Sequence, residues 1–131
     1  MRTLIKNGKI VTQNCNREII DGDILIENDR IVSIGRCDES VDKIIDAAGD
    51  IILPGLINTH THVSMTSLKG LVDDVTFPAF LDKVFHLDDI RTPRDLEAGA
   101  AQGCIEMIHS GTTTFLDLYY SEDIIAKAVE R

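Results

Sequence analysis

The sequence ILPGLINTHTHVSM (residues 52–65) places two histidines one residue apart, behind a short apolar run and a Pro-Gly break. Side chains alternate between the two faces of an extended strand, so His60 and His62 should point the same way and Thr61 the other way. Two such imidazoles at a strand end can converge on one metal ion, with zinc–nitrogen distances of about 2.0–2.1 Å. The pair alone is weak evidence for a metal, and taken by itself it favours hydrogen-bonded structural histidines.

The charge balance of the chain argues against several classes of partner. The 131 residues carry a net charge of −9, with 22 acidic and 13 basic side chains. Nucleic acids and anionic membranes are bound through positive patches, so we expect neither as a partner. No apolar run approaches the roughly 20 residues of a membrane-spanning helix. The first ten residues hold Asn, Gly and two Lys where a signal peptide has an apolar stretch, and we expect a cytoplasmic protein.

Residues 1–54 have the pattern of short β-strands joined by turns. Asn7-Gly8 separates two β-prone stretches and predicts a two-residue hairpin. The Asn28-Asp29 pair, flanked by isoleucines, predicts a second hairpin, and residues 47–49 predict a third turn of the same kind. Strands this short and closely spaced indicate half of a small β-sandwich, which we assign to residues 1–54.

After Pro54-Gly55 the pattern changes to alternating strands and helices. The sequence predicts a short buried strand at 56–60, a helix from Phe77, a helix capped by Thr92 and closed by Gly111, a strand at 112–120 and a further helix from Ser121. This α/β order is the opening of a parallel barrel or sheet. A closed barrel needs about 250 residues, so we expect residues 55–131 to be the amino-terminal piece of a longer protein.

Three stretches together resemble the metal-dependent amidohydrolase superfamily, in its deaminase and chlorohydrolase branch. They are IDAAGDIILPGLINTHTH at 45–62, SMTSLKG at 64–70 and SGTTTFLDLYY at 110–120. Asn58 stands where many members of the superfamily have Asp, a change that is found in this branch. The resemblance covers nearly the whole chain in order. It implies the amino-terminal part of a (β/α)8 TIM barrel, preceded by half of a β-sandwich.

The resemblance also implies a chemistry. Such enzymes bind one divalent metal, often zinc, with iron or manganese as alternatives, through the paired histidines, two later histidines and a later aspartate. In this chain His60 and His62 match the pair. The metal makes hydroxide available near neutral pH for attack on a ring carbon that bears an amino or chloro group. The acid/base groups of the family lie beyond position 131, so we expect no catalytic residue here and an inactive isolated chain.

The expected substrate is a small molecule, an aminated heterocycle with a purine nucleoside derivative as the leading candidate. Cyclic amidase, imidazolone-type and chloro-triazine-type hydrolysis remain alternatives within the superfamily. A non-catalytic binding or assembly piece is the alternative from another class, and a homo-oligomer remains open. Counting back from Thr92, Asp88 falls where related deaminases hold ribose hydroxyls through a glutamate, and Asp89 lies one residue away. The competing interpretation of both acids is a solvated role before the next helix.

Five other side chains are expected to have structural or surface roles. His109 lies in the last turn of a predicted helix, where a partial positive charge suits the helix dipole. Asp117, in the second barrel-type strand, is expected to support the site. Tyr119 and Tyr120 are expected to pack at the end of that strand. His86 has a position typical of a lid in the family, and a surface role is favoured for it.

Overall fold

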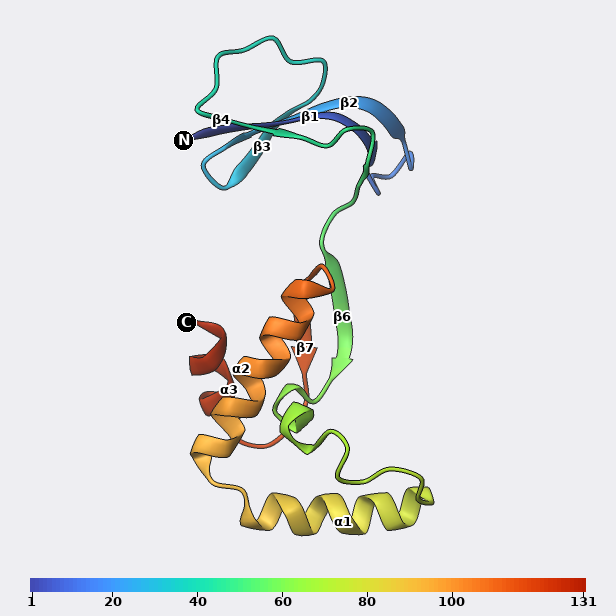
Figure 1. Cartoon of the computed structure of the whole chain (residues 1–131), viewed down its shortest axis with the longest axis vertical. Helices are drawn as coiled ribbons and strands as arrows, with labels where there is room; N and C mark the ends of the chain where they lie inside the picture. Colours follow the sequence, from blue (N-terminus) through green and yellow to red (C-terminus); the bar gives the residue numbers. More distant parts are fainter. The chain divides into compact units, whose positions relative to one another are not determined.

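The computed structural model describes all residues, 1–131, as two compact units, residues 1–54 and residues 55–131. None of its helices is long and apolar enough to cross a membrane. The elements are β1 (Arg2–Val11), β2 (Ile19–Glu27), β3 (Arg30–Gly35), β4 (Lys43–Asp46), β5 (Ile51–Ile52), β6 (Leu56–Thr61), the 3-10 helix η1 (Val63–Leu68), α1 (Phe77–Ile90), α2 (Pro93–His109), β7 (Thr112–Asp117) and α3 (Glu122–Val129) (Figure 1).

The first unit is a single five-stranded sheet with β1 at its centre. The strand order is β3-β2-β1-β4, and β5 also pairs with β1. β1 and β2 are antiparallel, as are β2 and β3, whereas β4 and β5 both run parallel to β1. The buried side chains of this sheet are those of Leu4, Ile10, Ile24 and Leu25.

The hairpin predicted at Asn7-Gly8 is wrong, because β1 runs through these residues without reversing. The register of β1 against β2 shifts between Ile5 and Gly8, and Asn7 has a φ of +59°. This is a β-bulge. The Asn7 backbone N–H donates to Asp23 Oδ1 at 3.0 Å, and its side-chain amide donates to Asp46 Oδ1 at 2.9 Å. The contacts of Asn7 to β2 and β4 therefore stabilise a bend within β1 instead of a turn between two strands.

The other two predicted turns have different outcomes. The hairpin at Asn28-Asp29 is confirmed, since Glu27 pairs with Arg30 and Asn28 has a φ of +56°. At residues 47–49 strands flank the turn as expected. However, β4 and β5 do not pair with each other, because each runs parallel to β1. That turn offsets the chain along β1 instead of reversing it.

The second unit has the predicted strand–helix–strand–helix order. β6 and β7 lie side by side and parallel, and α2, which connects α1 to β7, packs against η1 and β7 (Figure 1). The 3-10 helix η1 was not predicted, and these residues do not form a closed barrel. β6 was predicted to be buried, yet Leu56 is 54% exposed and Ile57 is 69% exposed. Its hydrophobic side chains remain accessible because β7 is its one neighbouring strand.

The tightest packing in the second unit joins α2 to η1. Gly99 and Gly103 face η1 from α2, and a Cβ atom at Gly99 would overlap the Ser64 carbonyl oxygen. Val63 and Ser64 on η1 are buried against this helix. Glycine at both positions lets η1 approach the α2 backbone closely. The hydrophobic core of the unit continues from this contact through Val63, Ala100, Ile125 and Ala128.

α2 begins with the cap that its sequence predicts. Thr92 Oγ1 accepts a hydrogen bond from the Asp95 N–H at 3.3 Å, and Asp95 Oδ2 accepts one from the Thr92 N–H at 2.8 Å. This reciprocal pair is a capping box, and hydrogen bonds from Thr92 lower the pKa of the Asp95 carboxyl. Gly111, with a φ of +81°, follows the helix as expected.

Replacing Thr92 with alanine should destabilise the second unit by about 1 kcal/mol, because an unpartnered N–H is left at the helix start. Thr76, the N-cap residue of α1, makes no side-chain cap hydrogen bond and supplies a matched control. Thr76→Ala should therefore have much the smaller effect. Thermal unfolding followed by circular dichroism measures both variants. Equal losses would contradict a specific role for the capping box.

Candidate metal centre and adjoining pocket

His60 and His62 lie at the carboxyl end of β6. His60 is in the strand, and His62 directly follows it as the residue before η1. Their ring centroids are 5.4 Å apart, with the planes at 72° to each other. His60 is exposed and His62 is half-buried. The alternation of the strand thus brings the two imidazoles together, as the spacing predicted.

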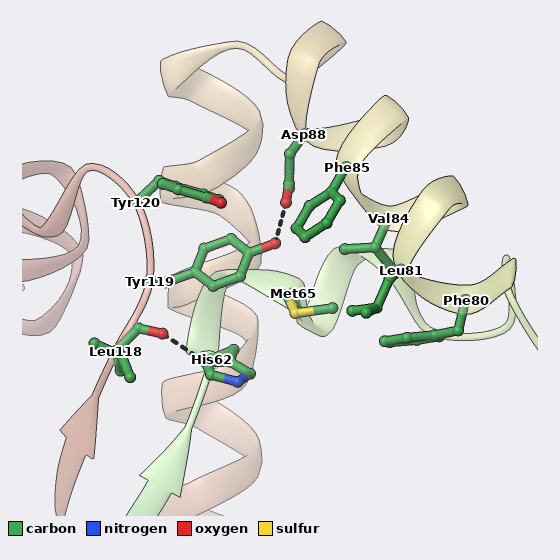
Figure 2. Close-up of a pocket in the computed structure, with 10 residues that line it drawn as sticks. All are labelled: His62, Met65, Phe80, Leu81, Val84, Phe85, Asp88, Leu118, Tyr119 and Tyr120. Carbon is green, nitrogen blue, oxygen red and sulfur yellow. Dashed lines mark hydrogen bonds between the residues drawn. The ribbon is translucent and has the colours of Figure 1, made fainter. Parts of the chain in front are cut away.

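A hydrogen bond from β7's end fixes the orientation of the His62 ring. His62 Nδ1 lies 2.6 Å from the backbone carbonyl oxygen of Leu118 (Figure 2). A carbonyl oxygen only accepts, so Nδ1–H is the donor and the proton of a neutral ring resides there. Nε2 then keeps its lone pair. Histidines that bind metals usually donate their other ring N–H in this way.

The donor set at this strand end suits a divalent transition metal. Imidazole nitrogen is a good ligand for zinc and iron. The His62 ring, with its free Nε2, lies next to the His60 ring. No group of three or more His, Cys, Asp or Glu side chains in the chain is placed to hold a metal ion. A catalytic zinc site usually has three protein ligands, so these residues fit part of such a site.

Asp117, the last residue of β7, joins the ends of the two parallel strands. Its Oδ1 accepts hydrogen bonds from the backbone N–H groups of Val63 and Leu118, each at 3.1 Å. Val63 directly follows His62, and Leu118 carries the carbonyl group that orients the His62 ring. Asp117 therefore holds both backbone segments around His62, which agrees with the supporting role expected for it. Its Oδ2 is buried without a hydrogen-bond partner.

A pocket of about 320 Å³ opens beside His62. One of its walls is the apolar face of α1, and the opposite wall comes from the segment after β7 (Figure 2). The polar groups that enter it are the His62 ring, the Asp88 carboxylate and the two tyrosine side chains. Its lining residues are His62, Met65, Phe80, Leu81, Val84, Phe85, Asp88, Leu118, Tyr119 and Tyr120.

Asp88 is held in this pocket by two partners and is not a solvated acid. Its side chain is 11% exposed, and its Oδ1 accepts a hydrogen bond from Arg91 Nη1 at 3.0 Å. Its Oδ2 accepts a hydrogen bond from the Tyr119 hydroxyl (Figure 2). Asp89 is exposed and is absent from the pocket lining. The solvated interpretation is therefore wrong for Asp88.

Sequence reasoning missed the part that Tyr119 plays. We expected simple packing at a strand end, but the ring centroid of Tyr119 is 5.4 Å from that of His62 and its hydroxyl reaches Asp88 on α1. Burial is the main cause that raises the pKa of the Tyr119 phenol, and the hydrogen bond to Asp88 is the second. The phenol therefore remains a protonated donor at neutral pH. Nothing in the sequence distinguishes it from Tyr120, since β7 ends at Asp117 and the strand alternation stops there.

Comparison with known proteins decides the family. Residues 51–131, which include both histidines, Asp88 and Tyr119, match the model of the amidohydrolase family. The chain belongs to the amidohydrolase family.

This amidohydrolase chain is similar to two archaeal deaminases. It is 48% identical over 130 residues to a 5'-deoxyadenosine deaminase of Methanobrevibacter smithii, with 97% of this chain and 30% of that protein covered. It is 44% identical over 131 residues to a 5-methylthioadenosine/S-adenosylhomocysteine deaminase of Thermococcus kodakarensis, with 98% of this chain and 31% of that protein covered. The chain therefore spans about a third of the length of these relatives.

A solved structure has a similar fold. Atrazine chlorohydrolase from Arthrobacter aurescens TC1, crystallised with zinc, superposes with a TM-score of 0.84 at 26% sequence identity. The match covers 98% of this chain and 33% of the chlorohydrolase. The fold of the amidohydrolase chain is thus that of one third of a larger zinc-containing protein.

Two further histidines of this amidohydrolase lie away from the candidate metal centre. His86 is on an exposed position of α1, and His109 is exposed in the last turn of α2. Neither side chain lines the pocket beside His62. Both agree with the surface or structural roles that were expected for them.

Proposed function

We propose that the whole protein is a metal-dependent deaminase of a purine nucleoside derivative, and that His60 and His62 provide two of its metal ligands. The observation that carries the proposal is the His62 ring, whose Nδ1 is bound by the Leu118 carbonyl group and whose Nε2 is free beside His60. The two deaminases described above, at 48% and 44% identity, support the choice of substrate class.

A divalent metal bound there would supply Lewis acidity, lowering the pKa of water so that a nucleophile forms at neutral pH. Zinc is the metal we propose, with iron or manganese as alternatives of the same charge. The remaining metal ligands and the acid/base groups would come from outside these 131 residues. Since most catalytic zinc sites have three protein ligands, we further propose that the isolated chain binds zinc weakly and is inactive.

The residues of the pocket suit a nucleoside. Phe80, Phe85 and Tyr119 offer apolar and aromatic surface to a flat ring, and aromatic side chains favour stacked or edge-to-face contacts. Asp88 offers a carboxylate to hydroxyl groups. Two of its lone-pair sites are used by Arg91 and Tyr119, and a carboxylate has about four such sites. We therefore propose Asp88 as a substrate-binding residue.

The whole protein, loaded with zinc, should release ammonia from 5'-deoxyadenosine, 5'-methylthioadenosine and S-adenosylhomocysteine. It should release little product from atrazine or a cyclic amide, because the pocket beside His62 offers a carboxylate that suits ribose hydroxyls. An enzyme-coupled ammonia assay measures the first set, and chromatography measures the second. Chelator-treated protein is the control and should recover with added zinc. Turnover of only atrazine or a cyclic amide would refute the proposed substrate class.

A further inference from the structure

A chain of side chains connects the segment after β7 to α1 and η1 across the pocket. The Tyr119 hydroxyl donates to Asp88 Oδ2, and Arg91 Nη1 donates to Asp88 Oδ1 at 3.0 Å. Arg91 Nη2 donates in turn to the Ser64 carbonyl group and, at 3.3 Å, to Ser67 Oγ. The side chain of Arg91 is 6% exposed, so this connection is well shielded from water.

We propose that Tyr119 is a positioning residue that fixes the direction of the Asp88 carboxylate in the pocket beside His62, ready to accept ligand hydroxyl groups. The inference rests on the proposed function and deepens it. Arg91 alone holds one oxygen of the carboxylate from the α1 side, which leaves the side chain free to rotate about that contact. The Tyr119 hydroxyl donates to the other oxygen from the opposite wall of the pocket, where the ring of Tyr119 lies beside that of His62 (Figure 2).

The charge of Asp88 and the direction of its hydrogen bond to Tyr119 both support this role. The Arg91 guanidinium is already engaged by Asp88. The group presented to a ligand is therefore an acceptor with negative charge, which suits neutral hydroxyl donors and disfavours phosphates. A hydrogen bond from a phenol to a carboxylate also fixes its direction, and correct orientation of a binding group is what lowers the KM of a ligand that uses it.

The test uses the whole zinc-loaded protein and two ligands that differ only in ribose hydroxyls, adenosine and 2',3'-dideoxyadenosine. Tyr119→Phe removes one hydroxyl group and keeps the ring. It should raise the KM for adenosine about tenfold, the effect of losing one hydrogen bond to a charged group, with kcat within about twofold. The KM for the dideoxy ligand should stay unchanged. Asp88→Asn should likewise raise the KM for adenosine and leave the KM for the dideoxy ligand unchanged. Asp89→Asn, at the exposed neighbouring position, should change the KM for neither ligand.

The double variant Asp88→Asn, Tyr119→Phe separates positioning from a general structural effect. If Tyr119 acts through Asp88, the double variant should lose no more adenosine selectivity than Asp88→Asn alone. Equal losses for both ligands, or additive losses in the double variant, would overturn the proposal. If the wild-type protein deaminates neither ligand, calorimetric binding of the two ligands decides the inference instead. Wild-type protein that binds adenosine no tighter than 2',3'-dideoxyadenosine would overturn it. The proposed function fails only if the three nucleosides named above are not deaminated either.

Discussion

Replacing His62 with asparagine should lower ammonia release by the whole protein at least about 100-fold and reduce its zinc content well below one ion per chain. The reason is the single orientation that the Leu118 carbonyl group imposes on the ring, which leaves one nitrogen for a metal. Changing groups that only orient a metal ligand commonly costs about 10–100-fold in metal affinity or activity, so loss of the ligand itself should cost more. Activity assays and atomic absorption on the same preparations measure both effects.

The control for this prediction is His109→Asn, at the exposed end of α2, and it should leave zinc content and activity unchanged. His60→Asn should behave like His62→Asn, because the two rings lie 5.4 Å apart, edge to face, at one strand end. Full zinc content and activity in either site variant would show that the pair has only a structural role.

The histidine pair could be predicted from sequence because it depends on local geometry. Alternation along one strand sets the directions of His60 and His62, and the strand itself is indicated by an apolar run after Pro54-Gly55. The same holds for the cap of α2, where Thr92 and Asp95 lie three residues apart. Interactions between residues close in the sequence depend on local geometry. The structure confirms the shared direction of the two imidazoles and the Thr92 cap.

Interactions between elements were not accessible in this way. Tyr119 and Asp88 lie 31 residues apart, and Tyr119 follows the strand, where no periodicity fixes its direction. The two Asn-containing turns make the same point. Asn28 forms a hairpin, whereas Asn7, whose local sequence is the stronger hairpin signal, forms a bulge because Asp23 from another strand binds its backbone. Only the tertiary contacts distinguish these two outcomes.

Substituting Gly99 with alanine is expected to destabilise the protein by about 1–3 kcal/mol, the usual cost of overpacking a close contact. On an exposed helix the same change would stabilise by up to about 1 kcal/mol, so the sign itself is informative. A Cβ atom at Gly99 would overlap the Ser64 carbonyl oxygen and lie 3.0 Å from Ser67 Oγ. Ser64 is completely buried, so η1 has little room to yield.

The consequence of this substitution should extend to the metal centre, because η1 begins directly after His62. Gly103→Ala should act in the same way, since its Cβ would lie 2.6 Å from Val63 Cγ2. Gln102→Ala, on the exposed face of α2, should stay within about 0.5 kcal/mol of the wild type. Thermal unfolding and zinc titration of the whole protein measure both effects. A Gly99→Ala variant that unfolds at or above the wild-type temperature would mean that α2 and η1 do not pack this closely, and that the position of His62 does not depend on their contact.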